Sequence, residues 1–231
     1  MNKTLKDIWM AGHEGRCHKW EHYFHIYERY LQKYRDQKIS YLEIGVQRGG
    51  SLDMMREYLG NEATIIGIDK DPYCKRSETN GHKIFIGDQS DKSLLFDVIK
   101  EHPCFDIIID DGGHTSDQQI KSFTTLFPYL NYGGVYIVED LHCSQYWVGY
   151  QNSDLGINFL DYAKGLADKL SLYHMREDWF LNRYGTDPKN RPDNHIKFSN
   201  LAVNDIFSIC FFDSIIAIEK EKRTEPYHIE K

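Results

Sequence analysis

The stretch YLEIGVQRGGS, residues 41–51, joins an apolar run to closely spaced glycines. The run YLEIGV (41–46) predicts a buried strand, and the residues after it predict a helix that Ser51 caps and that ends near Leu59. Outward from this stretch, strands and helices alternate along the chain. The other runs that predict strands are TIIGID (64–69), KIFIGD (83–88), FDIIID (105–110) and GGVYIVED (133–140), with helices predicted at 91–101 and 116–127.

Apolar runs this continuous are typical of strands that are covered on both faces, which means a parallel sheet with crossover helices. Near the C-terminus, IFSICFF (206–212) and SIIAIEK (214–220) predict an antiparallel pair at the sheet edge. The predicted fold is therefore α/β: a Rossmann-like, doubly wound, mostly parallel seven-stranded sheet with an antiparallel C-terminal hairpin strand. An amphipathic helix is also predicted at 16–33, with Trp20, Phe24, Tyr27 and Leu31 at helical spacing.

We expect a single domain over residues 1–231, because the chain can bury one sizeable core and no repeat or linker interrupts the pattern. The polar loop YGTDPKNRPDNH (184–195) matches no known pattern, and with the N-terminal helix it is expected to cover the substrate. The aromatic N-terminal helix could also pack against a second copy of the chain. The expected parts are an N-terminal helical segment (1–38), a cofactor and metal core (39–142), a substrate and lid region (143–205) and the terminal hairpin (206–220).

Composition excludes several classes of protein. The net charge of −7 lacks the basic footprint of a nucleic-acid binder, although Lys189 to Arg191 could form a local basic pocket. No apolar run reaches the ~20 residues that cross a bilayer, and the first residues lack the apolar core of a signal peptide. The five cysteines form no C-x-x-C pair, which argues against a disulfide framework or a zinc site. These features predict a cytoplasmic protein without nucleic-acid or membrane partners.

The glycine loop after the first strand is placed to meet a ligand, because glycine allows close backbone approach where a strand turns into a helix. A dinucleotide fingerprint would have a second glycine where this chain has Gln47. The spacing E-x-G-x-x-x-G suits a ligand with amino-acid and nucleoside ends and no phosphate. Gly45 and Gly49 fit a plain strand-to-helix turn equally well.

Three polar residues follow the second and third strands. Asp69 ends the second strand at the distance from the glycine loop where an acid accepts hydrogen bonds from both ribose hydroxyls, although it could also cap a helix. Asp88 and Gln89 follow the third strand, where a carboxylate and an amide could meet an adenine edge. Asp88 could equally be the N-cap of the helix at 91–101.

Two acidic pairs end the fourth and fifth strands, Asp110-Asp111 and Glu139-Asp140. If the two strands are neighbours, these carboxylates converge, and their mutual repulsion raises at least one pKa. A hard divalent cation relieves that repulsion, and oxygen ligands suit Mg²⁺, Mn²⁺ or Ca²⁺. The alternative is that the acids only cap helices and face water.

Aromatic and imidazole side chains follow both acidic pairs. His114 lies three residues after Asp111 in a glycine-rich loop, and we interpret it as a general base, because histidine accepts protons near neutral pH. A structural histidine is the alternative. His142 is a weaker second candidate for the base and fits the pocket wall better, as a weak substrate contact. Tyr146, Trp147 and Tyr150 are weak candidates for substrate contacts, and aromatic residues at such positions also occur in cores.

These residues resemble those of the class I S-adenosylmethionine-dependent methyltransferases. More narrowly, the chain is similar to the metal-dependent sugar O-methyltransferases of macrolide biosynthesis, of the mycinamicin and tylosin types, and to their relatives in polysaccharide gene clusters. The glycine loop is generic to the superfamily, whereas the D-D-G-x-H and E-D-L motifs are specific. The matching stretches are LEIGVQRGGSL (42–52), IIGIDKDP (65–72), IGDQSD (86–91), FDIIIDDGGHTSDQQIKSF (105–123) and GGVYIVEDLHCSQYW (133–147).

The resemblance implies S-adenosylmethionine and Mg²⁺ (or Mn²⁺ or Ca²⁺) as cofactors, with His114 as the general base. One departure is Gly113, where the family usually has serine, which could loosen the histidine loop. The implied metal ligands are Asp111, Glu139 and Asp140. The implied cofactor-binding residues are Glu43, Gly45, Gly49, Ser51, Asp69, Asp88, Gln89 and Asp110, the last touching the cofactor or acting from behind the site.

The function expected from the resemblance is O-methylation of a hydroxyl on a sugar, a sugar nucleotide or a glycosylated metabolite, in surface polysaccharide or natural-product biosynthesis. Three alternatives stay open: methylation of a non-sugar small molecule, a nucleotide-dependent oxidoreductase or sugar-modifying enzyme on a similar sheet, and a cofactor-binding protein without catalysis. The missing G-x-G speaks against the second of these, and the complete acid and histidine set speaks against the third.

Overall fold

The structure is a computed structural model that describes residues 3–12, 17–151, 153–168, 170–171, 205–224 and 229. Strands and helices alternate through the central part of the chain, as the apolar runs predicted. The strands are β1 (Ser40–Ile44), β2 (Thr64–Asp69), β3 (Lys83–Ile86), β4 (Phe105–Asp110), β5 (Leu130–Val138), β6 (Ile206–Phe211) and β7 (Ile216–Lys220). The α-helices are α1 (Leu5–Gly12), α2 (Tyr23–Leu31), α3 (Gly50–Leu59), α4 (Lys92–Glu101), α5 (Ser116–Leu126), α6 (Leu141–Tyr146) and α7 (Phe159–Asp168).

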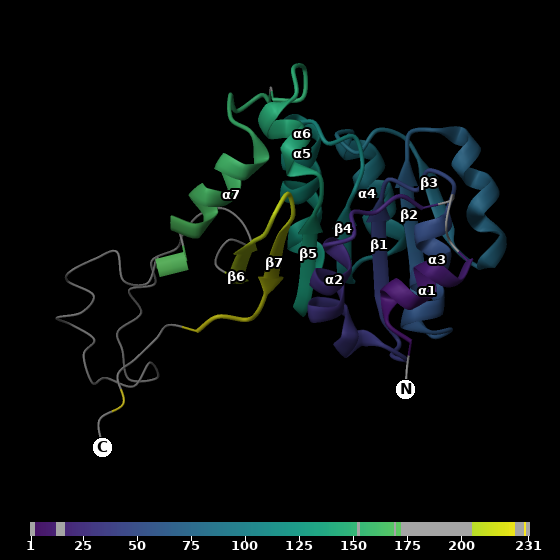
Figure 1. Ribbon diagram of the computed structural model, residues 1–231. Helices are drawn as coiled ribbons and strands as arrows, with labels where there is room; N and C mark the ends of the chain where they lie inside the picture. Colours follow the sequence, from purple (N-terminus) through teal and green to yellow (C-terminus); the bar gives the residue numbers. More distant parts are fainter. Residues whose placement is uncertain are drawn as a thin grey trace.

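The strands form one seven-stranded sheet in the order β3-β2-β1-β4-β5-β7-β6 (Figure 1). β1 pairs in parallel with β2 and β4, and β5 continues this parallel set beside β4. β7 is antiparallel to both of its neighbours, β5 and β6. The predicted fold class is therefore confirmed, including the C-terminal hairpin.

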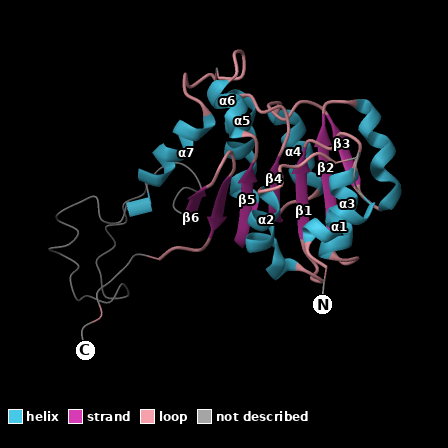
Figure 2. Cartoon of the chain, in the orientation of Figure 1, coloured by secondary structure: helices cyan, strands magenta, loops and turns pink. Residues whose placement is uncertain are grey.

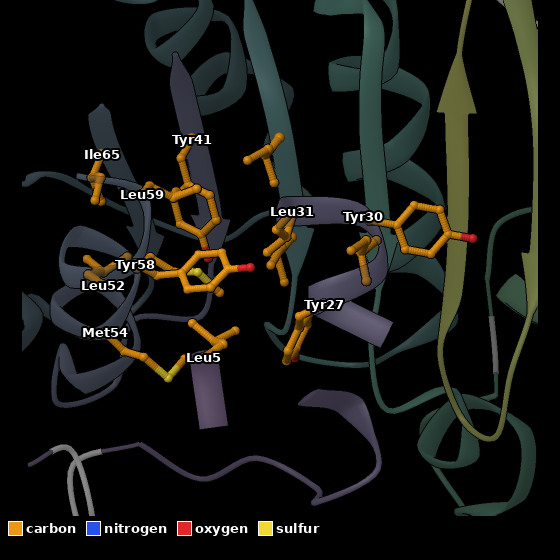
Figure 3. Packing of buried hydrophobic residues seen from close by; sticks show 14 of the residues in the cluster. Leu5, Tyr27, Tyr30, Leu31, Tyr41, Leu52, Met54, Tyr58, Leu59 and Ile65 are labelled. Atoms are coloured by element: carbon orange, nitrogen blue, oxygen red, sulfur yellow. The ribbon is translucent and has the colours of Figure 1, made fainter. Parts of the chain in front are cut away.

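Helices cover both faces of the sheet (Figure 2). One apolar cluster joins α1, α2 and α3 to one face, and a second joins α4, α5 and α7 to the other. Figure 3 shows Tyr27 and Leu31 of α2 in the same cluster as Tyr41 of β1 and Leu52 of α3. Full burial of a leucine-sized side chain stabilises the fold by roughly 1.5–3 kcal/mol, so this two-sided covering fixes the strands in place.

Three of the parallel strands end earlier than the apolar runs suggested. β1 ends at Ile44, β3 at Ile86 and β5 at Val138, each two residues before the predicted end. The next residues leave the ladder because they turn: Gly45 has a φ of +95° and Asp140 has a φ of +53°. Gly45, Asp88 and Glu139 therefore lie in loops at the carboxyl edge of the sheet, where ligands bind in open α/β folds.

The predicted helix at 16–33 is wrong in its first part. The helix α2 begins at Tyr23, and Trp20 precedes it with 54% of its surface exposed, so Trp20 does not share the buried face of Tyr27 and Leu31. Residues 17–20 instead run along the carboxyl edge, where the Lys19 side chain forms ion pairs with the acidic residues. The sequence pattern also missed the short helix α1.

Two predicted helix caps are also wrong. Ser51 lies inside α3, whose N-cap position is Gly49, and the Ser51 hydroxyl donates to Glu43 instead. Asp88 does not cap α4, because Asp91 occupies that N-cap and accepts a hydrogen bond from the backbone N–H of Ser93. The alternative in which Asp88 was only the cap of α4 is thereby removed.

Much of the predicted lid lies outside the described residues, including the loop 184–195 and the basic stretch Lys189 to Arg191. Among the helices that the structure does describe, none has the length and apolar character needed to span a bilayer.

Candidate active site

A cavity of about 300 Å³ opens at the carboxyl ends of β1, β2, β3 and β4. Its wall combines residues from the glycine loop, the acidic strand ends and the histidine loop. Most of the residues expected to bind a cofactor or to catalyse therefore face one space. The predicted residues that line it are Gly45, Asp69, Asp88, Gln89, Asp111 and His114, joined by Gln47, Gln118 and Tyr150.

Asp69 fastens the glycine loop to the end of β2. Its Oδ2 accepts hydrogen bonds from the backbone N–H groups of Val46 and Gln47 at 2.8 and 2.9 Å, and its Oδ1 accepts one from Asp71 at 2.9 Å. A carboxylate offers about four lone-pair sites, so this arrangement leaves about one for a ligand hydroxyl. The contact of Asp69 with both ribose hydroxyls that the sequence suggested stays a prediction.

Asp88 also lines the cavity, beside Gln118, a residue that the sequence did not single out. Its Oδ1 accepts hydrogen bonds from the backbone and hydroxyl of Ser90 at 2.8 and 2.6 Å. The Gln118 amide of α5 donates to the same carboxylate at 3.1 and 3.3 Å. Burial raises the pKa of Asp88, but these hydrogen bonds outweigh it, so its pKa is below the ordinary value and the carboxylate stays charged.

Asp110 and Gln89 form a buried layer under the cavity. The Gln89 amide donates to both Asp110 oxygens at 2.8 and 3.0 Å, and its carbonyl oxygen accepts from the backbone N–H of Gly113 at 2.8 Å. Asp110 is fully buried and does not line the cavity. Burial raises its pKa. Asp110 therefore supports the histidine loop from behind, through Gln89.

Glu43 is likewise buried and lies outside the cavity wall. Its two carboxylate oxygens accept hydrogen bonds from the hydroxyls of Tyr41 and Ser51, and burial raises its pKa. These contacts tie β1 to the first turn of α3. They hold the glycine loop between the two elements in its tight conformation.

His114 meets the acidic pairs at the mouth of the cavity. Its Nε2 lies 3.9 Å from Asp111 Oδ1 and 3.8 Å from Asp140 Oδ2. Ligand atoms of the three residues all lie within 4.8 Å of one another. The parallel pairing of β4 with β5 brings these residues together. Glu139 follows β5 directly beside Asp110 of β4, and the Glu139 N–H donates to the Asp110 carbonyl at 2.9 Å.

Lys19 was not predicted, and it occupies the other side of Asp111. Its ammonium lies 2.6 Å from Asp111 Oδ2 and 3.0 Å from each Glu139 oxygen, and its side chain is only 2% exposed. Burial lowers the pKa of Lys19, but the charges of Asp111 and Glu139 outweigh it, so the pKa is well above its ordinary value. The Tyr27 hydroxyl also donates to Glu139. Glu139 therefore faces a protein cation and a hydroxyl.

Asp140 is held by two aromatic side chains from the N-terminal segment. Its Oδ1 accepts hydrogen bonds from the Trp20 indole at 3.1 Å and from the Tyr23 hydroxyl at 2.9 Å, which leaves Oδ2 directed at His114. Backbone strain marks the same region. Of the five described non-glycine residues with positive φ, three are Gln47, His114 and Asp140. Strain of this kind concentrates at functional sites.

An aromatic wall continues outward from Asp140. The His142 ring makes edge contacts with Trp20 and Trp147, at centroid distances of 6.0 and 5.2 Å, and Trp147 meets Tyr150 at 5.7 Å. His142 Nδ1 lies 2.6 Å from the Ser214 hydroxyl, which fixes the ring. Trp147 is half exposed, whereas Tyr146 is 70% exposed. The predicted residues His142 and Trp147 are therefore part of one surface beside the cavity.

The donor set suits a hard divalent cation. Asp111 and Asp140 supply carboxylate oxygens that converge with a histidine nitrogen, and oxygen ligands are those that Mg²⁺, Mn²⁺ and Ca²⁺ prefer. In this structure the Lys19 ammonium lies between Asp111 and Glu139 and forms ion pairs with both carboxylates. Asp111 and Asp140 therefore fit a metal, whereas Asp111 and Glu139 are the two carboxylates that Lys19 engages.

Gly45 gives a test of how tightly the glycine loop approaches Asp111. A Cβ at this position would lie 2.0 Å from the Asp111 carbonyl oxygen, and its φ of +95° disfavours other residues. We expect Gly45→Ala to lower the free energy of unfolding by about 2–4 kcal/mol, since it adds overlap to backbone strain. Urea unfolding of the purified variant measures this.

Gly165 of α7 is the matched control, because a Cβ there would meet nothing within 4 Å. Gly165→Ala should raise the free energy of unfolding by about 0.5–1 kcal/mol, the usual gain for a helical position. Equal stability of Gly45→Ala and wild type would mean that the glycine loop does not approach Asp111 this closely.

Comparison with known proteins relates this chain to O-methyltransferases. No protein-family model matches the chain. An 8-demethyl-8-alpha-L-rhamnosyl tetracenomycin-C 2'-O-methyltransferase from Streptomyces olivaceus is 37% identical over 138 residues, which cover 57% of this chain and 36% of that protein. An L-olivosyl-oleandolide 3-O-methyltransferase from Streptomyces antibioticus is 32% identical over 182 residues, which cover 74% and 43% of the two chains.

A solved methyltransferase structure has the same fold as this chain. The MycE methyltransferase from the mycinamycin biosynthetic pathway, in complex with Mg, SAH and mycinamycin VI, superposes with a TM-score of 0.79 at 22% identity, over 99% of this chain and 56% of that one. The chain spans 36% and 43% of the lengths of the two curated relatives above. Over the regions that match, this chain is homologous to these O-methyltransferases.

Proposed function

We propose that the chain transfers a methyl group from S-adenosylmethionine to a hydroxyl of a glycosylated small molecule. One observation carries this proposal: a single cavity is lined by the carboxylates of Asp69 and Asp88 and by the pair Asp111 and His114. The curated relatives are O-methyltransferases, which supports the same reaction.

The nucleoside end of the cofactor would lie between β2 and β3. Asp69 retains about one lone-pair site for a ribose hydroxyl, and Asp88 would accept from the adenine edge together with Gln118. Ile44 and Ile68 line the same space and supply the apolar surface that a base requires. Because Gln47 stands at the second glycine position of a dinucleotide fingerprint, the loop suits this ligand better than NAD.

The amino-acid end would lie along the glycine loop, toward Asp111. Gly45 brings the loop against the Asp111 carbonyl, and Glu43, Ser51 and Asp69 hold the loop from behind. The reacting methyl group would then point to the mouth of the cavity, where His114 lies. Alignment of the acceptor and the methyl group within this cleft would provide much of the acceleration.

The acceptor would bind against the aromatic wall. Trp147 packs edge-on against both His142 and Tyr150, and Tyr150 lines the cavity. Aromatic side chains of this kind bind the apolar faces of small ligands, while nearby polar groups fix their orientation. The names of the relatives specify rhamnosyl and olivosyl compounds, which favours a glycosylated natural product over a polysaccharide as the acceptor.

Asp111, Asp140 and Glu139 would hold a divalent cation, and His114 would act as the general base. The cation supplies Lewis acidity that lowers the pKa of a hydroxyl bound to it. His114 Nε2, which faces both Asp111 and Asp140, would take the proton of the acceptor hydroxyl as the hydroxyl oxygen accepts the methyl group. The sulfur compound that remains is S-adenosylhomocysteine.

Methyl transfer itself tests the proposal. The purified chain is incubated with S-adenosylmethionine labelled in its methyl group, Mg²⁺ and a panel of rhamnosyl and olivosyl glycosides, and products are identified by mass spectrometry. We expect label on a sugar hydroxyl and an equal amount of S-adenosylhomocysteine. Transfer only to acceptors that lack sugars would overturn the proposed substrate class, and no transfer to any hydroxyl would overturn the reaction.

A further inference from the structure

The carboxylates of Asp111, Glu139 and Asp140 form an acidic cluster. Lys19 is the one buried cation that contacts this cluster in the described part of the chain. Its ammonium joins Asp111 Oδ2, at 2.6 Å, to both oxygens of Glu139, at 3.0 Å. The Tyr27 ring lies 5.8 Å from the same nitrogen, and the Tyr27 hydroxyl donates to Glu139. A buried carboxylate needs a partner of this kind, because an unpaired buried charge is strongly destabilising.

Two of the three carboxylates proposed to hold a divalent cation are thus already engaged by a protein cation. Asp111 is shared: its Oδ2 faces Lys19, whereas its Oδ1 faces His114 and Asp140. A divalent cation bound by Asp111 and Glu139 would lie within a few ångströms of the ammonium, where like charges in a buried site repel strongly. The two cations therefore exclude each other at these oxygens.

We propose that Lys19 is an internal counter-ion that competes with the divalent metal, so that metal binding requires the ammonium to leave Asp111 and Glu139. The inference rests on the proposed function, because it takes the metal from there. The lysine stem has four flexible carbons, so the ammonium can swing away without a change in the main chain. While Lys19 is in place, its positive charge balances the buried charge of Glu139, so the acidic cluster is stable without metal.

Metal affinity tests the competition directly. Binding of Mn²⁺ is measured by electron paramagnetic resonance for the wild type, for Lys19→Met and for Lys164→Met. Lys164 is an exposed lysine that pairs with Asp161 on α7, so its substitution removes the same charge away from the site. We expect Lys19→Met to bind Mn²⁺ about 10- to 100-fold more tightly than wild type, the scale on which neighbouring groups change metal affinity. Lys164→Met should match wild type.

A second measurement uses the wild-type chain, so it decides the matter even if Lys19→Met does not fold. Lysine amines are acetylated with and without saturating Mn²⁺, and the modified peptides are quantified by mass spectrometry. Lys19 should be protected without metal and should become several-fold more reactive with it, whereas Lys164 should react equally in both. Unchanged protection of Lys19 with metal bound would overturn the proposal.

The outcomes separate this inference from the proposed function. Equal Mn²⁺ affinity in wild type and Lys19→Met would overturn the role of Lys19 and leave the metal site intact. Absence of Mn²⁺ binding in all three proteins, with S-adenosylhomocysteine still bound, would overturn the metal part of the proposed function and this inference together.

Discussion

Replacing His114 with alanine is expected to lower turnover by about 10²–10⁴-fold, the usual contribution of a positioned general base. The reason is geometric: Nε2 faces Asp111 and Asp140 at 3.9 and 3.8 Å, at the mouth of the cavity. The affinity for S-adenosylhomocysteine should change little, because the proposed nucleoside contacts lie at Asp69 and Asp88. Release of S-adenosylhomocysteine measures turnover, and calorimetry measures the affinity.

The control is His25→Ala, an exposed histidine on α2. It should retain wild-type turnover, which separates loss of the base from loss of any histidine. Turnover of His114→Ala equal to that of wild type would remove His114 from the proposed role. A parallel loss of cofactor affinity and turnover would instead indicate that His114 positions the loop.

The second large effect is expected from metal removal. Excess EDTA should lower turnover by about 10²-fold or more, because the acceptor hydroxyl would lose several kcal/mol of charge stabilisation. Added Mg²⁺ should restore the rate. The same concentration of EDTA already saturated with Mg²⁺ is the control for effects of the chelator itself.

Full activity in excess EDTA, with metal content measured and found to be negligible, would contradict the proposed metal. Lys19 would then be the cation of the acidic cluster during the reaction, since it already contacts Asp111 and Glu139. In that case Lys19→Met, rather than chelation, should lower the rate.

The sheet could be predicted from the sequence because strands buried on both faces leave continuous apolar runs. The run FDIIID (105–110) matches β4 residue for residue. Strand ends were harder to predict: Gly45 and Glu139 were assigned to strands, but both lie beyond them. Apolar pattern alone does not report where the backbone turns, and the turning residues are the ones that face the cavity.

The gathering of Asp111, His114 and Asp140 could also be predicted, because parallel strands bring their carboxyl ends to one edge. Lys19 could not. It lies 92 residues from Asp111 and 120 from Glu139, and a lysine ahead of an amphipathic helix is ordinarily solvated. The helix predicted over 16–33 also made the role of Lys19 harder to predict. Trp20 fitted the apolar spacing of that helix, whereas its indole donates to Asp140.

Other residues gained roles that their sequence context did not suggest. Gln118 of α5 reaches Asp88, and a Cβ at Gly113 would lie 2.1 Å from the Gln118 Oε1. Gly113 therefore leaves space for the Gln118 amide. Side-chain contacts across two loops depend on packing that local sequence does not encode.

Titration of S-adenosylhomocysteine into the wild-type chain tests most directly whether the cavity at the ends of β1 to β4 is a methyltransferase cofactor site. Calorimetry should give one bound molecule per chain, and NAD⁺ titrated under the same conditions should give no binding. Absence of S-adenosylhomocysteine binding by the folded chain, or displacement of it by NAD⁺, would contradict this assignment.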